Sequence, residues 1–241
     1  METTSKPKTE SDHIADARAK LLAAALPHVA FDGWTRDTFE AAITDSGLDD
    51  GLARSAAPRG GIDLAIAFHR AGDAAMVAAL DAEDLSAMRF SERIEYAVRK
   101  RIEIAGLDRE AVRRGVTLFA LPINAAEGAK LVWGTADKIW TTLGDSSTDY
   151  NWYSKRTILS GVYSATLLYW LGDESEGAEA TWAFLTRRIA GVMQFEKVKA
   201  QVRDNKLASA LLAGPKMLLS GIKAPGSGGT GTPVGLPGRK G

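Results

Sequence analysis

The sequence predicts an all-α protein of about nine to ten helices. Alanine, leucine, arginine and glutamate are abundant and alternating runs of β-branched residues are missing, which favours helices over strands. Glycine, proline and capping residues divide the chain into helix-length segments with short connections, a pattern typical of helical bundles. With 241 residues, 45% of them apolar, the chain is long enough to bury a substantial core.

Start and stop residues place the individual helices. Thr35 and Asp108 are expected N-caps, whereas Pro27 and Gly47 are expected to end the helices before them. Pro122 is acceptable in the first turn of a helix. The predicted helices are residues 14–26, 35–43, 48–56, 62–80, 91–105, 109–121, 122–143, 157–171 and 179–195.

Composition divides the chain into four parts. We expect a disordered tail over residues 1–12, a helical domain over 13–205, an amphipathic helix over 206–223 and a flexible Gly/Pro-rich tail over 224–241. Three short helices followed by longer ones resemble the layout of the tetracycline-repressor fold. That fold has a small helix-turn-helix head on a larger helical body with an internal ligand pocket.

The charge pattern argues against DNA binding by this head. The whole chain carries 30 basic and 30 acidic residues, and the segment 28–63 holds three basic against seven acidic ones. The candidate recognition helix begins with Asp49 and Asp50, which would repel phosphates. We therefore expect a degenerate helix-turn-helix kept as scaffold and no nucleic-acid partner. The alternative is a ligand-responsive transcription regulator of the tetracycline-repressor class.

The sequence shows no clustered catalytic residues. There are no cysteines, which excludes disulfides and thiolate catalysis. The three histidines, His13, His28 and His69, form no pair at helical spacing that would bind zinc. We expect no catalytic residues, no metal and no cofactor; a helical enzyme of unusual type is the remaining alternative.

The run Gly144 to Arg156, GDSSTDYNWYSKR, concentrates acids, bases and aromatic residues around a turn. Ser147 or Thr148 is a candidate cap for the helix that follows, and Asp149 in its first turn would complement the helix dipole. Exposed tryptophan and tyrosine beside charges are typical of binding hot spots. The same aromatic residues are equally well explained as core beneath the turn.

This run, together with ILSGVYSATLLYWLGDES, TWAFLTRRI and the earlier ALPHVAFDGWT, resembles the ubiquinone (coenzyme Q) biosynthesis lipid-binding accessory protein family. The resemblance implies a tetracycline-repressor-like fold without DNA binding, a homodimer, a lipid pocket and a C-terminal membrane-associating helix. The implied partners are the di-iron demethoxyubiquinone hydroxylase, isoprenoid quinone intermediates or phospholipid, and a membrane surface. Helices over 158–171 and 182–192 would form the dimer interface.

The resemblance also implies a surface patch that meets the hydroxylase. Carried over by motif, Asp149, Trp152 and Tyr153 belong to this patch, and Ile139 and Trp140 are its expected neighbours.

The segment 206–223 has a strongly amphipathic pattern. Lysines and serines occupy the opposite arc, as in helices that lie in the headgroup plane of a membrane. The alternative is that the apolar stripe packs on the protein body, and Pro215 is expected to kink or break this helix. The apolar side chains of the stripe are Leu207, Leu211, Leu212, Leu218, Leu219 and Ile222.

The pocket candidates come from the apolar helices in the middle of the chain. Ser160, Gly161, Ser164 and Ala165 are small, and either leave space beside them or allow two helices to pack closely. The predicted lining residues are Leu118, Leu121, Val162, Tyr163, Leu167 and Leu168.

Together these observations predict a non-catalytic accessory protein that binds an isoprenoid quinone intermediate at a membrane and presents it to the hydroxylase. We expect it in the cytoplasm, peripheral on the inner face of a bacterial inner membrane, or on the matrix side if the source is mitochondrial. The longest apolar stretch, residues 157–172, is too short to span a membrane and is predicted as a buried helix.

Overall fold

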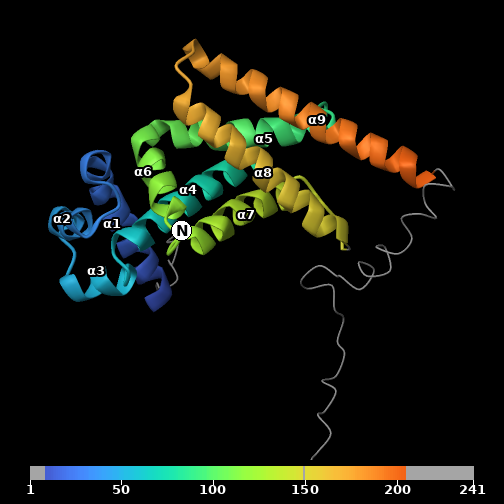
Figure 1. Cartoon of the computed structure of the whole chain (residues 1–241). Coiled ribbons are helices and arrows are strands. Elements are labelled where there is room, and N and C mark those ends of the chain that lie inside the picture. Colours follow the sequence, from blue (N-terminus) through green and yellow to red (C-terminus); the bar gives the residue numbers. More distant parts are fainter. Residues whose placement is uncertain (1–8, 149, 205–241) are drawn as a thin grey trace, which may run out of the picture.

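The computed structural model describes residues 9–148 and 150–204 and confirms the predicted all-α class (Figure 1). Two short 3-10 turns, Gly106–Asp108 and Glu176–Ala178, complete the regular structure of these residues. The α-helices are α1 (Glu10–Asp32), α2 (Arg36–Ser46), α3 (Asp50–Ala56), α4 (Gly61–Ala82), α5 (Phe90–Ala105), α6 (Arg109–Ala120), α7 (Ala125–Thr142), α8 (Tyr150–Gly172) and α9 (Glu179–Asp204).

The helices form a small head and a larger body, each with its own core. Helices α1, α2 and α3 make the head at one end of the molecule (Figure 1). Leu21, Val29 and Phe39 lie in the head core, which also includes Leu64 at the start of α4. The body core begins further along the same helix, at Met76. Helix α4 therefore joins the two cores as one continuous element.

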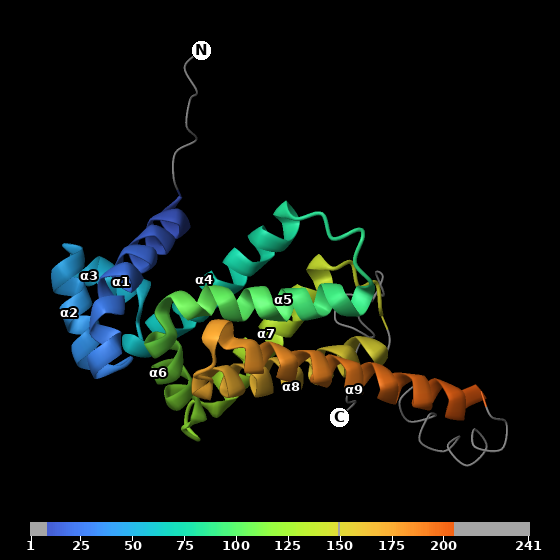
Figure 2. The same ribbon diagram turned by 90° about the horizontal axis from the view of Figure 1, so that it is seen from above.

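The body packs α4, α5, α7, α8 and α9 around a second apolar cluster. Helix α9 packs against both α5 and α8 (Figure 2), and α8 also contacts α7. Ile102, Ile139 and Tyr163 are almost completely buried at the centre of this cluster. In the part of the chain that the structure describes, no helix is long and apolar enough to cross a membrane.

Helix α1 is longer than predicted at both ends. It begins at Glu10, inside the expected tail, because Thr9 and Asp12 form a capping box at its N-terminus. It also continues through Pro27, so the predicted stop there is wrong. Proline removes only one backbone hydrogen bond, and Val29 is fully buried in the head core beyond it. That packing outweighs the local cost and carries the helix to Asp32.

Other helix ends follow the predicted capping residues more closely. Thr35 accepts a hydrogen bond from the backbone of Thr38, as an N-cap does, and Gly47 ends α2 in the left-handed conformation with φ of 63°. Helix α7 starts at Ala125, three residues after Pro122. The difference arises because residues 121–124 form a turn in which the side chain of Asn124 donates to the Leu118 carbonyl (3.1 Å).

A buried carboxylate joins three helices of the body. Asp73 on α4 is 1% exposed and accepts hydrogen bonds from Arg101 on α5 (2.8 Å) and from Thr135 and Lys138 on α7 (2.9 and 3.1 Å). A Cβ at Gly72 would lie 2.9 Å from the Arg101 guanidinium, so only glycine lets the arginine approach this closely. These contacts fix the spacing of α4, α5 and α7.

We predict that Asp73→Ala lowers the free energy of unfolding by about 3–5 kcal/mol, because it leaves the guanidinium of Arg101 buried without its carboxylate. Denaturant unfolding monitored by circular dichroism measures this. As a matched control, Arg36→Ala breaks an exposed ion pair with Glu40 (3.8 Å) and should change stability by at most about 1 kcal/mol. Equal effects of the two substitutions would contradict the assigned role of Asp73.

Candidate functional site

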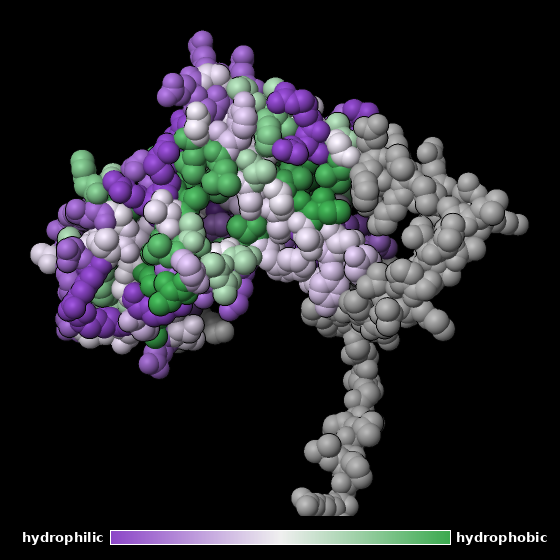
Figure 3. Space-filling model, in the orientation of Figure 1, coloured by the Kyte–Doolittle hydropathy of each residue, from purple (hydrophilic) through white to green (hydrophobic). Residues whose placement is uncertain are grey.

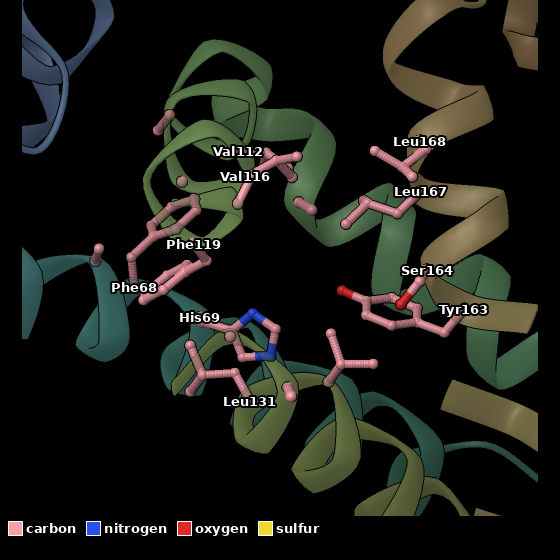
Figure 4. Close-up of a pocket in the computed structure, with 18 of the residues that line it drawn as sticks. Phe68, His69, Val112, Val116, Phe119, Leu131, Tyr163, Ser164, Leu167 and Leu168 are labelled. Carbon is pink, nitrogen blue, oxygen red and sulfur yellow. The ribbon is translucent and has the colours of Figure 1, made fainter. Parts of the chain in front are cut away.

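An apolar cavity of about 270 Å³ lies where the head meets the body. Helices α4, α6, α7 and α8 form its walls (Figure 4), and Trp34 closes it on the side of the head. The residues labelled in Figure 4 are Phe68, His69, Val112, Val116, Phe119, Leu131, Tyr163, Ser164, Leu167 and Leu168. A cavity of this size and lining is typical of a site for an apolar small molecule.

Helix α6 is the wall that connects head and body. On the head side, the indole of Trp34 donates to the Ala111 carbonyl (3.1 Å), and Arg114 donates to the Ala30 carbonyl (3.2 Å). On the body side, Arg113 donates to the Leu171 carbonyl at the end of α8 (2.8 Å). Side-chain to backbone bonds therefore tie the N-terminal half of α6 to both the head and the body.

Half of the predicted lining residues face the cavity. Tyr163, Leu167 and Leu168 line it. Val162 does not: it lies about 100° around the helix from Tyr163 and faces the groove between α8 and α9. Ser164, one of the small residues, does line the cavity, whereas Gly161 and Ala165 line that groove.

The two candidates around the end of α6 are also placed elsewhere. Leu118 packs against the head core, and Leu121 is 49% exposed in the turn after the helix. The cavity face of α6 is instead formed by Val112, Val116 and Phe119. Their spacing of four and three residues is the period of one helix face, so this pattern in the sequence would have identified them.

A polar group on α4 closes the floor of the cavity. Nε2 of His69 lies 2.9 Å from Oγ1 of Thr135, and Arg101 donates to the His69 carbonyl (3.0 Å). Burial lowers the pKa of His69 to about 4, and the charge of Arg101 lowers it in the same direction. The imidazole is therefore neutral at physiological pH, and it is tied to the buried carboxylate Asp73 through Thr135.

Tyr163 brings a second polar group to the cavity from α8. It is 1% exposed, and its ring lies 5.9 Å from the guanidinium of Arg101. Its hydroxyl is directed into the space above His69 (Figure 4). Burial raises the pKa of the phenol, so the hydroxyl keeps its proton at neutral pH and serves as a donor.

A second feature, on α7 and the first turns of α8, is a cluster of half-buried aromatic side chains. Trp152 and Tyr153 meet edge to face with ring centres 4.8 Å apart, and Trp133 lies 5.9 Å from Trp152 and 6.4 Å from Tyr153. The guanidinium of Arg156 lies 4.0 Å from the ring of Trp152. We call Trp133, Trp152 and Tyr153 the aromatic patch; Trp133 was not among the predicted site residues.

The expected neighbours of this patch lie beneath the surface. Ile139 is completely buried in the body core, and Trp140 is 9% exposed. The indole of Trp140 donates to the Lys155 carbonyl (3.2 Å). These two residues belong to the body core, so they are not accessible to a partner. Asp149, the other candidate, lies outside the described residues.

Buried charges hold the turn before α8 against the aromatic patch. Asp145 is paired with Lys155 (2.8 Å) and with Arg156 (3.0 Å), which is 2% exposed. Burial alone would raise the pKa of Asp145, but hydrogen bonds from Lys155, Ser147 and Arg156 outweigh it and lower the pKa to about 2. Ser147, a predicted cap, accepts from Lys155 (2.6 Å) and donates to Asp145 (2.8 Å).

The predicted membrane helix, residues 206–223, and the tail 224–241 lie outside the described residues. Within residues 9–148 and 150–204, no three histidine, aspartate or glutamate side chains come together in a way that would hold a metal ion.

Comparison with solved structures defines the class of protein. The chain is similar to a TetR transcriptional regulator from Nitrosomonas europaea, with a TM-score of 0.60 and 17% sequence identity. The match covers 73% of this chain and 97% of that one. The chain therefore has a tetracycline-repressor-like fold, as predicted.

Sequence comparison relates the chain to one family. The COQ9 family model matches residues 125–196. This range contains α7 and α8, which both line the cavity, and the aromatic patch. The chain is 31% identical to the mitochondrial ubiquinone biosynthesis protein COQ9 of Drosophila melanogaster over 76% of its length. It is 29% and 28% identical to the COQ9 proteins of Rattus norvegicus and Homo sapiens over 84% and 77% of its length. The chain is similar to these COQ9 proteins along most of its length, and it spans 57%, 67% and 60% of these three relatives.

The low pKa of His69 predicts acid sensitivity. Its folded-state pKa of about 4 lies below the ordinary value of 6.5, so the unfolded chain binds more protons between these values. Stability should fall by roughly 3 kcal/mol from this residue as the pH drops from 6.5 to 4. His69→Gln should flatten this part of the pH profile of chemical denaturation. His13→Gln, outside the cavity, is the control; if both variants keep the wild-type slope, His69 is not buried as a neutral group.

Proposed function

We propose that this protein is a member of the COQ9 family, a non-catalytic accessory protein of ubiquinone biosynthesis that binds an isoprenoid quinone intermediate in its cavity. The cavity, enclosed by apolar walls and placed between head and body, is the observation that carries the proposal. Burying an isoprenoid chain there removes it from water, which is favourable by about 25 cal/mol per Å² of apolar surface. The relatives carry the name of ubiquinone biosynthesis proteins, which supports this choice of ligand.

The aromatic patch is the proposed docking surface for the demethoxyubiquinone hydroxylase. Trp133, Trp152 and Tyr153 are half-buried rings held by each other and by Arg156. Rigid aromatic side chains lose little conformational entropy on binding and are enriched in interface hot spots. The buried ion pairs of Asp145 below them keep the surface in one conformation. In this proposal the hydroxylation chemistry belongs to the partner.

We further propose that the protein acts as a homodimer at the surface of a membrane. The face of α8 supports a dimer contact, because it carries hydrophobic surface (Figure 3) that includes Leu168, 57% exposed, and Tyr169, 41% exposed. Tyr169 stacks on Phe184 of α9 with ring centres 4.6 Å apart. The amphipathic segment 206–223 would bring the dimer to the lipid. The proposed location is the inner face of a bacterial inner membrane or, as for the relatives, the mitochondrion.

A transcription regulator is the second candidate, because the fold is shared with one. The head argues against it. Helix α3 is capped by Asp49 and begins at Asp50, so carboxylates occupy the end that would approach phosphates. Its one basic residue, Arg54, is held by Glu40 (3.0 Å) and Asp50 (2.9 Å). Binding to duplex DNA that weakens steeply with salt would favour the regulator.

Val116→Trp should fill the cavity from α6 and reduce binding of a decyl-tailed ubiquinone analogue at least tenfold, because the ligand and the indole compete for one volume. Quenching of intrinsic fluorescence measures the affinity. Thr117→Trp places the same indole on the exposed side of the same helix and should bind like the wild type. If Val116→Trp binds normally while remaining folded, this cavity is not the ligand site.

Trp152→Lys should weaken binding of the hydroxylase by tenfold or more, because a central aromatic side chain of the interface is lost. Surface plasmon resonance with the purified hydroxylase measures the change, and the melting temperature should fall by only a few degrees. Tyr96→Lys is the matched control: Tyr96 is a half-buried aromatic residue beneath a lysine (5.3 Å), outside the aromatic patch. A collapse of stability in Trp152→Lys with unchanged hydroxylase affinity would make this tryptophan purely structural.

A further inference from the structure

The proton of His69 lies on the ring nitrogen that faces away from the cavity. Nε2 of His69 is 2.9 Å from the hydroxyl of Thr135, and that hydroxyl donates its only proton to Asp73 (2.9 Å) or to the Leu131 carbonyl (3.2 Å). Towards His69 the hydroxyl can only accept, so Nε2 carries the proton. The carboxylate of Asp73, 3.7 Å from Nε2, favours the same arrangement.

The other nitrogen, Nδ1, is therefore a hydrogen-bond acceptor on the cavity side of the ring (Figure 4). Protonation cannot turn it into a donor near neutral pH, since the pKa of His69 is about 4. Moving the proton to Nδ1 would require the Thr135 hydroxyl to donate to His69, which would take a hydrogen bond from the buried carboxylate of Asp73. Nδ1 of His69 therefore presents a hydrogen-bond acceptor, and not a donor, to the cavity.

Tyr163 supplies the complementary group. Its hydroxyl is directed into the same space as the imidazole (Figure 4). A hydroxyl in largely apolar surroundings is stabilised by a hydrogen-bond partner. A ligand oxygen placed between His69 and Tyr163 would be such a partner. The lining also includes Ser164 and Arg101, whose guanidinium donates to Asp73 and to the His69 carbonyl, and the remaining side chains are mainly apolar. His69 and Tyr163 are the acceptor and the donor that face each other across this space.

We propose that the cavity selects an apolar molecule whose polar end is a hydroxylated ring, a phenol or hydroquinone, over the corresponding quinone. The ligand hydroxyl donates to Nδ1 of His69, and a ring oxygen accepts from the hydroxyl of Tyr163. The apolar tail lies along Val112 and Val116 on α6. This inference rests on the proposed function and specifies the chemical state of the ligand that the protein carries.

A quinone satisfies only half of this site. Its carbonyl oxygens accept from Tyr163 but have no proton to give to His69, so a carbonyl near Nδ1 places two lone pairs against each other. A site built to bond a hydroxyl rejects the analogue that lacks the proton, because its own buried group is then left unpaired. Because a quinone leaves Nδ1 of His69 unpaired, we expect the reduced form to bind about tenfold more tightly or better.

The test compares a decyl-tailed benzoquinone with its hydroquinone, bound under anaerobic conditions to the full-length protein. Quenching of tryptophan fluorescence reports binding, since Trp34 lines the cavity. The hydroquinone should bind about tenfold tighter. His69→Leu should abolish this preference by weakening hydroquinone binding alone. Tyr163→Phe, which removes one hydroxyl and keeps the ring, should weaken both forms several-fold.

A redox titration gives an independent readout of the same preference. Tighter binding of the reduced form raises the midpoint potential of the bound ligand by about 30 mV for each tenfold difference in affinity. His69→Leu should return the potential to that of the free ligand. If His69→Leu does not fold, Tyr163→Phe and the potential of the wild-type complex still decide the matter.

The outcomes separate this inference from the function on which it rests. Equal affinities for the two forms, unaltered potential and no effect of Tyr163→Phe would overturn the inference. If Val116→Trp still abolished binding in that case, the lipid-binding proposal would stand. Failure of both forms to bind the wild-type protein would overturn the inference and the lipid-binding proposal together.

Discussion

The buried carboxylate of Asp73 is the constraint on which the rest of the structure depends. It is the point where α4, α5 and α7 meet, and Arg101, Thr135 and Lys138 converge on it. A buried charge is tolerated only with such partners, so the three helices are held in one arrangement. The same contacts orient His69, because Thr135 links the carboxylate to the imidazole. The contacts of Asp73 therefore position both the helices of the body core and the imidazole at the cavity floor.

The position of the cavity is determined by the contacts of Asp73 and by the placement of α6. With α4, α5 and α7 fixed, α6 crosses from the head to the end of α8, held by Trp34 and Arg113. The space behind it is lined by apolar side chains except at His69, Arg101, Tyr163 and Ser164. In the proposed account the protein uses the ligand-pocket architecture of a regulator fold while the head, with Arg54 neutralised by two carboxylates, serves as scaffold.

Local chemistry was predictable from the sequence, and packing between distant segments was not. Thr35 and Gly47 act as predicted because a cap is decided within one turn. The predicted end of the helix at Pro27 was wrong, because burial of the following turn, and not local propensity, decides whether the helix continues. Two tryptophans of α7 show the same limit. Trp140 lies in the body core, whereas Trp133 is half-buried in the aromatic patch, and this difference depends on how α7 packs against α8.

Native mass spectrometry of the protein purified from its own host, followed by lipid extraction, shows whether the cavity holds a ligand of ubiquinone biosynthesis. We expect a co-purified isoprenoid with a hydroxylated or quinonoid ring, at a stoichiometry of up to one per chain. If the protein is empty on isolation and stays empty after incubation with quinone-loaded liposomes, the cavity is not a site for such a ligand.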